Sequence, residues 1–282
     1  MDEDTLIASG KEVTRRVIRG AGYEILRGSD DPILRTLVAA YNQLRMSKLD
    51  SEAWRLVLPR LASLSHLRAT LLGRGIDLVI DVGANCGQFA RDLRSVGFAG
   101  EIISFEPLAK YREHLQRQAE TDGRWRCFAF ALGHSTEERL LNVYRDDSFS
   151  SVHSINEAGQ EQFGALVDLV DVERVEMRKL DDISEELGIS SGKRILLKTD
   201  TQGHDADVIR GARQTLRNVT DVLTEATVRS IYGGTSTLDE MSKILLDEGF
   251  AHGGMFPIAY VKGAFELIEM DCYFTRVEAG KL

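Results

Sequence analysis

The sequence predicts an α/β fold, in which a mostly parallel β-sheet carries helices on both faces and follows a helical N-terminal region. From Gly75 onward, short apolar segments alternate with amphipathic ones, which is typical of a parallel sheet. A glycine-rich turn joins the first of these apolar segments to the helical pattern behind it. The 282 residues are 43% hydrophobic and 28% charged, which is the composition of a globular protein with a sizeable core.

Residues 1–74 are expected to form a helical cap. A helical pattern runs through residues 54–72, where Pro59 should kink or restart the helix. Residues 1–75 hold 12 basic and 9 acidic side chains, whereas the remainder holds 23 basic and 35 acidic ones. Because the two parts carry opposite charge balances, we expect the cap to close over the substrate bound by the remainder of the chain or to form a homodimer interface. Its basic segment at residues 11–19 is a candidate for peripheral contact with an anionic membrane.

Residues 75–282 are expected to form the main domain. Strands are predicted at Asp77–Val82, Glu101–Phe105, Trp125–Leu132, Arg194–Thr199 and Asp221–Thr227, with helices between them. A β-rich insertion at about 133–180 interrupts this alternation and carries a serine-rich loop. A capping box beginning at Thr237 opens the last helix, and the chain from Met255 to Val277 should form a hairpin.

Charge and cysteine content narrow the classes of function. The net charge is −9, and an acidic main domain repels nucleic acid phosphates, so we expect no nucleic-acid partner. No apolar run approaches the ~18 residues of a membrane span, and the opening Met1-Asp2-Glu3-Asp4 is unlike a signal peptide. Cys86, Cys127 and Cys272 are far apart and lack a metal-ligand spacing. These features predict a reduced, cytoplasmic protein without a cysteine-based zinc site.

The sharpest local motif is the segment Asp81–Phe89, which joins a buried strand to a helix, where α/β folds place a nucleotide-binding turn. Gly83 and Gly87 let the backbone approach a ligand closely, and Asn85 tolerates left-handed dihedrals. A dinucleotide fingerprint would need glycine at positions 83, 85 and 88, of which this chain has the first alone. A dinucleotide-dependent oxidoreductase is therefore the weaker alternative.

A carboxylate follows the second predicted strand, in Phe105-Glu106-Pro107, 25 residues after Asp81. In doubly wound sheets this strand tip faces the ligand's ribose, and a carboxylate can accept hydrogen bonds from both ribose hydroxyls. The alternative role for Glu106 is to cap the helix that follows. Together, the turn and the spaced acid point to S-adenosylmethionine (SAM).

In chain order, the motifs resemble those of FkbM-type methyltransferases over roughly residues 76–277. They are Asp81–Phe89, Phe105-Glu106-Pro107, Ala131-Leu132-Gly133, Ser150-Ser151, Leu180-Asp181-Asp182 and Lys198-Thr199-Asp200-Thr201-Gln202-Gly203-His204-Asp205. One departure is Asp205, where the family commonly has Glu, so a carboxylate is retained.

The resemblance implies a class I, Rossmann-like methyltransferase fold and a SAM-dependent O-methyltransferase acting on a hydroxyl of a sugar, glycolipid or other secondary metabolite. The implied cofactor-binding residues are Asp81, Gly83, Ala84, Asn85, Gly87, Gln88, Phe89, Glu106, Pro107, Ala131 and Leu132. The turn would wrap the methionine end, Glu106 would bind ribose, and Ala131-Leu132 would line the adenine. Ser150, Ser151 and Glu225 are expected near the donor or the acceptor.

Lys198, Asp200 and His204 are the candidate catalytic residues. Lys198 and Asp200 share one face of a strand, and His204 starts the next helix. Methyl transfer to an alcohol needs a donor held in line and a base that takes the proton. We expect His204 to accept the proton, Asp200 to orient it or the hydroxyl, and Lys198 to keep Asp200 ionised. The structural alternative is an ion pair of Lys198 with Asp200 and an N-cap role for Asp205.

The alternative to a side-chain base in methyl transfer is a metal ion bound at the strand ends. Asp200 and Glu225 end successive strands and could offer oxygen ligands to a Mg²⁺ that binds the substrate. Because no third ligand is evident in the sequence, a metal site is not predicted. A non-catalytic ligand-binding protein on the same fold is a second rival, and the presence of Asp200 and His204 argues against it. The expected partner is a small-molecule or glycan acceptor.

Overall fold

The computed structural model describes residues 51–189 and 192–277. The helices expected before residue 51 and the basic segment at residues 11–19 lie outside these residues. Within them, the last part of the expected cap is α3 (Ser51–Gly73), which continues through Pro59 and does not restart there. No helix of the described ranges is long and apolar enough to cross a membrane.

The central sheet confirms the predicted α/β class. Its strands are β1 (Leu78–Val82), β2 (Glu101–Phe105), β3 (Trp125–Phe128), β7 (Ile195–Thr199), β8 (Val219–Thr227), β9 (Phe250–Tyr260) and β10 (Leu267–Arg276). Their order is β3-β2-β1-β7-β8-β10-β9. The first five are parallel to one another, whereas β10 runs antiparallel to both β8 and β9. The carboxyl ends of β1, β2 and β7 therefore meet at one edge.

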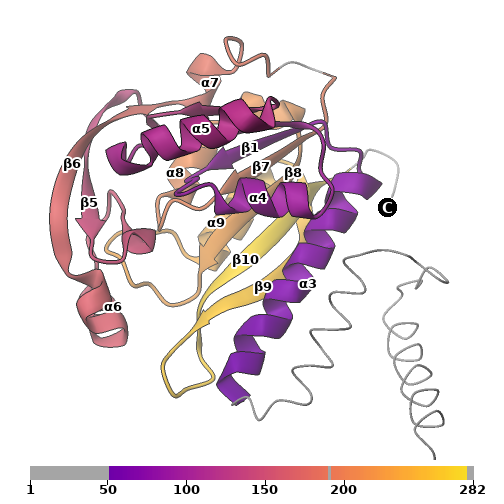
Figure 1. Cartoon of the computed structure of the whole chain (residues 1–282). Coiled ribbons are helices and arrows are strands. Elements are labelled where there is room, and N and C mark those ends of the chain that lie inside the picture. The colour runs from indigo at the N-terminus through magenta and orange to yellow at the C-terminus, as the bar shows by residue number, and fades with distance from the viewer. Residues whose placement is uncertain (1–50, 190–191, 278–282) are drawn as a thin grey trace, which may run out of the picture. The chain divides into compact units, whose positions relative to one another are not determined.

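Helices cover both faces of this sheet (Figure 1). They are α4 (Gln88–Ser95), α5 (Arg112–Asp122), α7 (Leu180–Ile183), α8 (Asp205–Arg210) and α9 (Leu238–Asp247). Alternate strand residues such as Ile80 and Leu197 point to one face, where they join a core that includes Val208 of α8 and Leu245 of α9. The intervening strand residues, among them Asp81 and Lys198, point to the other face, where the Lys198 ammonium lies 5.3 Å from the centre of the Phe89 ring in α4.

The expected third strand, Trp125–Leu132, is in fact two strands. After β3 ends at Phe128, the chain forms β4 (Ala131–Leu132), which leaves the central sheet and pairs with β6 (Leu169–Arg178). β6 also pairs with β5 (Glu137–Tyr144), so residues 131–178 hold a second, three-stranded sheet and the short helix α6 (Glu157–Phe163). An apolar run has no period that could reveal this division.

The helix α3 packs along the hairpin of β9 and β10. The Ser63 hydroxyl lies 3.3 Å from the Tyr273 hydroxyl, and the His66 ring meets the Tyr273 ring at 4.6 Å between centroids. Nearer the start of α3, the Arg55 guanidinium stacks 4.0 Å above the Tyr260 ring. These contacts attach α3 to the antiparallel end of the sheet.

The capping box at the start of α9 confirms the sequence prediction. The Thr237 hydroxyl accepts a hydrogen bond from the Glu240 amide, and the Glu240 carboxylate accepts one from the Thr237 amide. We expect Thr237→Ala to lower the free energy of unfolding by about 1 kcal/mol, because the Glu240 amide at the helix start loses the Thr237 hydroxyl as its acceptor. Chemical denaturation measures the change. Thr121→Ala on the exposed end of α5 is the matched control, and an equal loss there would contradict the capping role.

Candidate active site

A cavity lies where β1, β2 and β7 end, and the second sheet and its loop complete its wall. The space between the lining residues, counted together with its open mouth, is about 830 Å³. One end is apolar and is lined by Leu108, Ala131, Leu132, Leu141, Val152 and Met177. The other end is polar. Such a cavity suits an elongated ligand with a flat apolar part and a polar tail.

The glycine-rich turn after β1 brings the main chain against the end of β7. Gly83 has a φ of 80°, and a Cβ atom added there would lie 1.9 Å from the Asp200 carbonyl oxygen. Gly87 has a φ of 81°, and a Cβ atom there would lie 2.7 Å from the Trp125 ring. Asn85, between the two glycines, is also left-handed, with a φ of 48°. The turn therefore depends on its two glycines.

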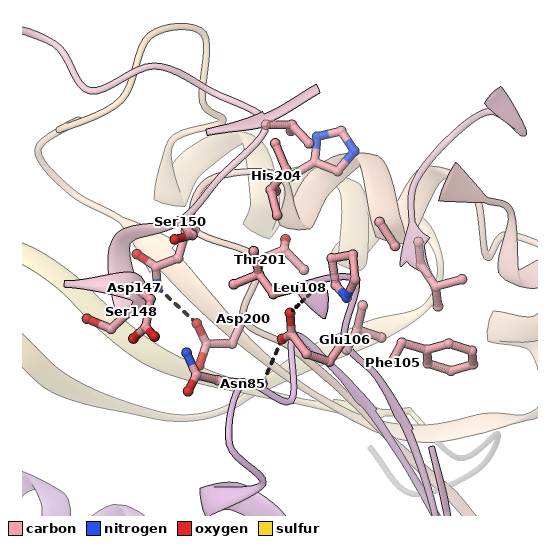
Figure 2. A pocket seen from close by; sticks show the side chains of 18 of the residues that line it. Asn85, Phe105, Glu106, Leu108, Asp147, Ser148, Ser150, Asp200, Thr201 and His204 are labelled. Atoms are coloured by element: carbon pink, nitrogen blue, oxygen red, sulfur yellow. Dashed lines mark hydrogen bonds between the residues drawn. The ribbon is translucent and has the colours of Figure 1, made fainter. Parts of the chain in front are cut away.

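Glu106 follows β2 and is buried, with 7% of its surface exposed. Its Oε2 accepts a hydrogen bond from the Asn85 amide at 2.7 Å, and its Oε1 accepts one from the Leu108 amide at 2.9 Å (Figure 2). Burial raises the pKa of Glu106 to about 7, although these two hydrogen bonds and Lys198 oppose the rise. An ionised carboxylate has lone pairs for further donors, so Glu106 can bind a diol in the cavity.

Lys198 connects the ends of β1 and β7. Its Nζ lies 2.9 Å from Asp81 Oδ1, donates to the Gly83 carbonyl at 3.0 Å, and lies 3.5 Å from Asp200 Oδ2. Asp81 is fully buried and also accepts a hydrogen bond from the Ser104 hydroxyl. Although burial disfavours its charged form, the carboxylates of Asp81 and Asp200 raise the pKa of Lys198. Lys198 does not line the cavity, so its contacts support the turn from behind.

Asp200 lies at the polar end of the cavity. Its amide donates to the Val82 carbonyl at 3.0 Å, and its Oδ1 accepts a hydrogen bond from Gln202 Nε2 at 3.0 Å. The same Gln202 Nε2 lies 3.5 Å from Glu225 Oε2, so one amide joins two carboxylates. Gln202 holds a left-handed φ of 53°, and Tyr232 donates its hydroxyl to Gln202 Oε1 at 2.8 Å.

The structure does not form the expected pair of His204 and Asp200. His204 Nδ1 lies 3.3 Å from Asp207 Oδ2 and 3.4 Å from His153 Nε2, and Figure 2 shows the ring apart from Asp200. His204 Nε2 is buried without a hydrogen-bond partner in the described structure, next to Gly133, where an added Cβ would lie 2.8 Å from it.

Burial lowers the pKa of His204 to about 4, although Asp207 opposes this shift. Both ring nitrogens are thus enclosed by protein. His204 is the N-cap residue of α8, and its ring lies beside Gly133, which directly follows β4. Sequence spacing could not reveal this direction.

Most of the other residues expected at the site line the cavity. From the turn and the tip of β2 these are Gly83, Asn85, Gln88, Glu106 and Pro107. From the remaining elements they are Ala131, Leu132, Ser150, Asp200, His204 and Glu225. Six expected residues lie outside the cavity lining, namely Asp81, Ala84, Gly87, Phe89, Ser151 and Lys198.

Three of these six support the lining from behind. Asp81 and Lys198 form the ion pair described above, and the Ser151 hydroxyl donates to the Gln202 carbonyl at 2.7 Å. Gln202, although part of the motif at residues 198–205, and Tyr232 were not predicted as site residues, because neither a left-handed φ nor a contact across 30 residues is visible in a motif.

The loop after β5 contributes polar groups that were not expected there. Asp147 and Ser148 line the cavity beside Ser150. The Asp147 carboxylate accepts hydrogen bonds from the Lys110 ammonium and the Tyr111 hydroxyl, which tie the loop to the segment after β2. In the described ranges, no three His, Cys, Asp or Glu side chains are grouped so that they could hold a metal ion.

The strand order and the glycine-rich turn define the class I methyltransferase fold. The sequence model of the methyltransferase FkbM domain matches residues 81–251, which is more than half of the chain. The chain therefore belongs to the FkbM methyltransferase family.

Two curated relatives are similar to this chain at low identity. The AMB antimetabolite synthetase AmbE of Pseudomonas aeruginosa is 28% identical over 205 residues, which cover 61% of this chain and 9% of AmbE. The 2-O-methyltransferase NoeI of Sinorhizobium fredii is 24% identical over 181 residues, which cover 62% of this chain and 74% of NoeI. The chain thus spans a small part of AmbE and about three quarters of NoeI.

Two solved structures are also similar. Methyltransferase FkbM from Methylobacillus flagellatus shares 16% identity at a TM-score of 0.45, over 71% of this chain and 43% of that one. Magnesium protoporphyrin IX methyltransferase from Synechocystis, solved with bound SAM, shares 10% identity at a TM-score of 0.42, over 90% of this chain and 100% of that one.

Proposed function

We propose that this protein is a SAM-dependent O-methyltransferase that methylates a hydroxyl of a small molecule or glycan. The observation that carries the proposal is Glu106, a buried carboxylate fixed between the glycine-rich turn and the apolar end of the cavity. A nucleoside with an amino-acid tail has the matching order of groups, which is a flat heterocycle, a diol and a charged end.

The residues present fit such a donor. Ala131, Leu132 and Met177 offer an apolar wall for the adenine, and Glu106 can accept hydrogen bonds from the ribose hydroxyls. Asn85 and Gln88 on the turn can contact the methionine end. The sulfonium of the bound donor supplies a methyl group that is already activated, so the protein's tasks are alignment and proton removal.

The O-direction and the acceptor class rest on the family and on one relative. NoeI is a 2-O-methyltransferase, which favours a hydroxyl acceptor. The acceptor would enter at the polar end, where Asp200, Ser150 and Glu225 can orient a hydroxyl through hydrogen bonds.

Donor affinity should depend on pH through Glu106. The ionised form accepts hydrogen bonds from the ribose hydroxyls, whereas protonation removes acceptor capacity. Since the pKa of Glu106 is raised to about 7, a fall in pH from 8 to 6 protonates the group. We expect the neutral product S-adenosylhomocysteine, which carries the same ribose, to bind about tenfold more weakly at pH 6 than at pH 8. Calorimetry on the wild type and on Glu106→Ala checks this, because an equal dependence in the variant would exclude Glu106 as its source.

Incubation of the full chain with methyl-labelled SAM and a panel of neutral methyl glycosides and phenols tests the activity. We expect the label in a new methyl ether, identified by its ¹³C resonance. Label on nitrogen or carbon would contradict the O-direction. A chain that binds SAM and leaves its methyl group in place with every compound of the panel would favour the non-catalytic alternative.

A further inference from the structure

Glu225 lies at the polar end of the cavity, and a second carboxyl group, the buried Glu269, lies near it in the sheet. β8 and β10 are antiparallel, with Glu225 opposite Asp271 and Thr227 opposite Glu269. Glu225 and Glu269 are therefore diagonal neighbours on one face of the sheet, within reach of long side chains. Two ionised carboxylates this close repel each other, so the pair favours a state in which one of them carries a proton.

Only one member of this pair reaches the cavity. Glu225 lines the cavity beside Asp200, whereas Glu269 is 7% exposed and lies behind it. The Gln202 amide holds Glu225 from the other side at 3.5 Å, and Tyr232 fixes that amide. The carboxyl group of Glu225 thus has a defined position at the end where the acceptor hydroxyl would enter.

We propose that Glu225 is the group that takes the proton of the acceptor hydroxyl. Glu269 and Gln202 are positioning residues, of which Glu269 increases the proton affinity of Glu225 and Gln202 holds its carboxyl group in place. The inference rests on the proposed function and replaces His204 in the role expected from sequence. In the step, the acceptor oxygen bonds to the methyl carbon and the carbon–sulfur bond breaks, with its electron pair left on sulfur. The hydroxyl proton moves to the Glu225 carboxylate and is later released to water.

The surroundings of Glu225 give its carboxyl group the proton affinity that a base needs. Exclusion of water raises the pKa of Glu225 well above its ordinary value, and the carboxylates of Glu269, Asp200, Asp205 and Asp271 raise it further. Burial raises the pKa of Glu269 to about 7. General bases work best when their pKa lies near the operating pH.

The other charged groups around this pair come from β7, α3 and the loop after β8. Lys198 is held by Asp81, Gly83 and Asp200. The positive charge of Arg60 in α3 opposes the rise that burial causes in the pKa of Asp271. The Tyr232 hydroxyl has a pKa raised by burial and by both glutamates, so it stays protonated. Acidic groups thus outnumber cations around Glu225, and their charges add to the rise in pKa that burial causes.

Comparison of SAM with S-adenosylhomocysteine tests the proposal without an acceptor. The two compounds differ by the methyl group and its positive charge. A cation beside Glu225 favours the ionised carboxylate, so SAM should expel a proton that the neutral product does not expel. Calorimetry in buffers of different ionisation enthalpy, between pH 6 and 9, counts these protons. Glu106 contacts the ribose of both compounds, so its contribution cancels in the difference.

We expect SAM to release roughly half a proton more than S-adenosylhomocysteine at the pH where the difference is greatest. Glu225→Gln should abolish the difference and retain binding of both compounds. In Glu269→Gln, the pH at which the difference is greatest should fall, because Glu225 binds its proton less tightly once the neighbouring negative charge is gone. Glu266→Gln, at an exposed ion pair with Arg229, should change nothing.

Equal proton release by both compounds in the wild type would overturn the proposal. The proposal would also be overturned if the difference in proton release survived in Glu225→Gln, or if the pH of the greatest difference stayed the same in Glu269→Gln. A chain that binds neither compound would contradict the proposed function itself, and the inference with it, so the two failures are distinguishable.

Discussion

Replacement of Lys198 by methionine is expected to lower the free energy of unfolding by about 3–5 kcal/mol, because it leaves the Asp81 carboxylate buried without its cationic partner. Asp81 has no exposed surface, and the Lys198 ammonium lies 2.9 Å from its Oδ1. The loss also removes the hydrogen bond to the Gly83 carbonyl, so the glycine-rich turn loses its support. Urea denaturation followed by circular dichroism measures the change.

Lys193→Met is the matched control. Lys193 precedes the same strand and pairs with Glu101 at 3.1 Å, but both side chains are substantially exposed to water. Exposed pairs of this kind contribute at most about 1 kcal/mol. If the two substitutions destabilised the protein equally, Lys198 would have no special role behind the turn.

Glu106→Ala is expected to weaken SAM binding by roughly 10- to 150-fold, because hydrogen bonds to a charged group contribute about 1.5–3 kcal/mol. The substitution removes the acceptor for the ribose hydroxyls and leaves the Asn85 and Leu108 amides without their carboxylate partner. Isothermal titration calorimetry gives the dissociation constants, and circular dichroism shows whether the fold is retained.

Glu101→Ala serves as the control for Glu106→Ala. Glu101 begins β2 and is exposed, whereas Glu106 follows the end of the same strand. Donor affinity should be unchanged in Glu101→Ala. Unchanged affinity in a folded Glu106→Ala variant would remove the ribose assignment.

The arrangement of the glycine-rich turn and Glu106 around the cavity could be predicted from the sequence because these features are local. A buried strand, a turn with Gly83 and Gly87, and an acid after the next strand need no long-range information beyond the parallel order of β1 and β2. In the structure, the Asn85 amide bonds to the Glu106 carboxylate, which joins the two motifs.

The surroundings of His204 and Glu225 could be predicted less well because their contacts depend on packing. The side chain of His204 follows the direction of a helix start, and its ring is enclosed by His153 and Asp207. Glu225 and Glu269 meet because β8 and β10 pair in one particular register, which no local pattern encodes. The same limit explains why the division of residues 125–132 into β3 and β4 was missed.

The central claim is that the cavity binds SAM. Equilibrium binding of SAM to the full chain, measured beside NAD⁺ under the same conditions, tests it most directly. We predict that SAM binds in the cavity, that affinity falls in Glu106→Ala, and that NAD⁺ does not displace SAM. Failure of the folded wild-type chain to bind SAM, or tighter binding of NAD⁺, would contradict this claim.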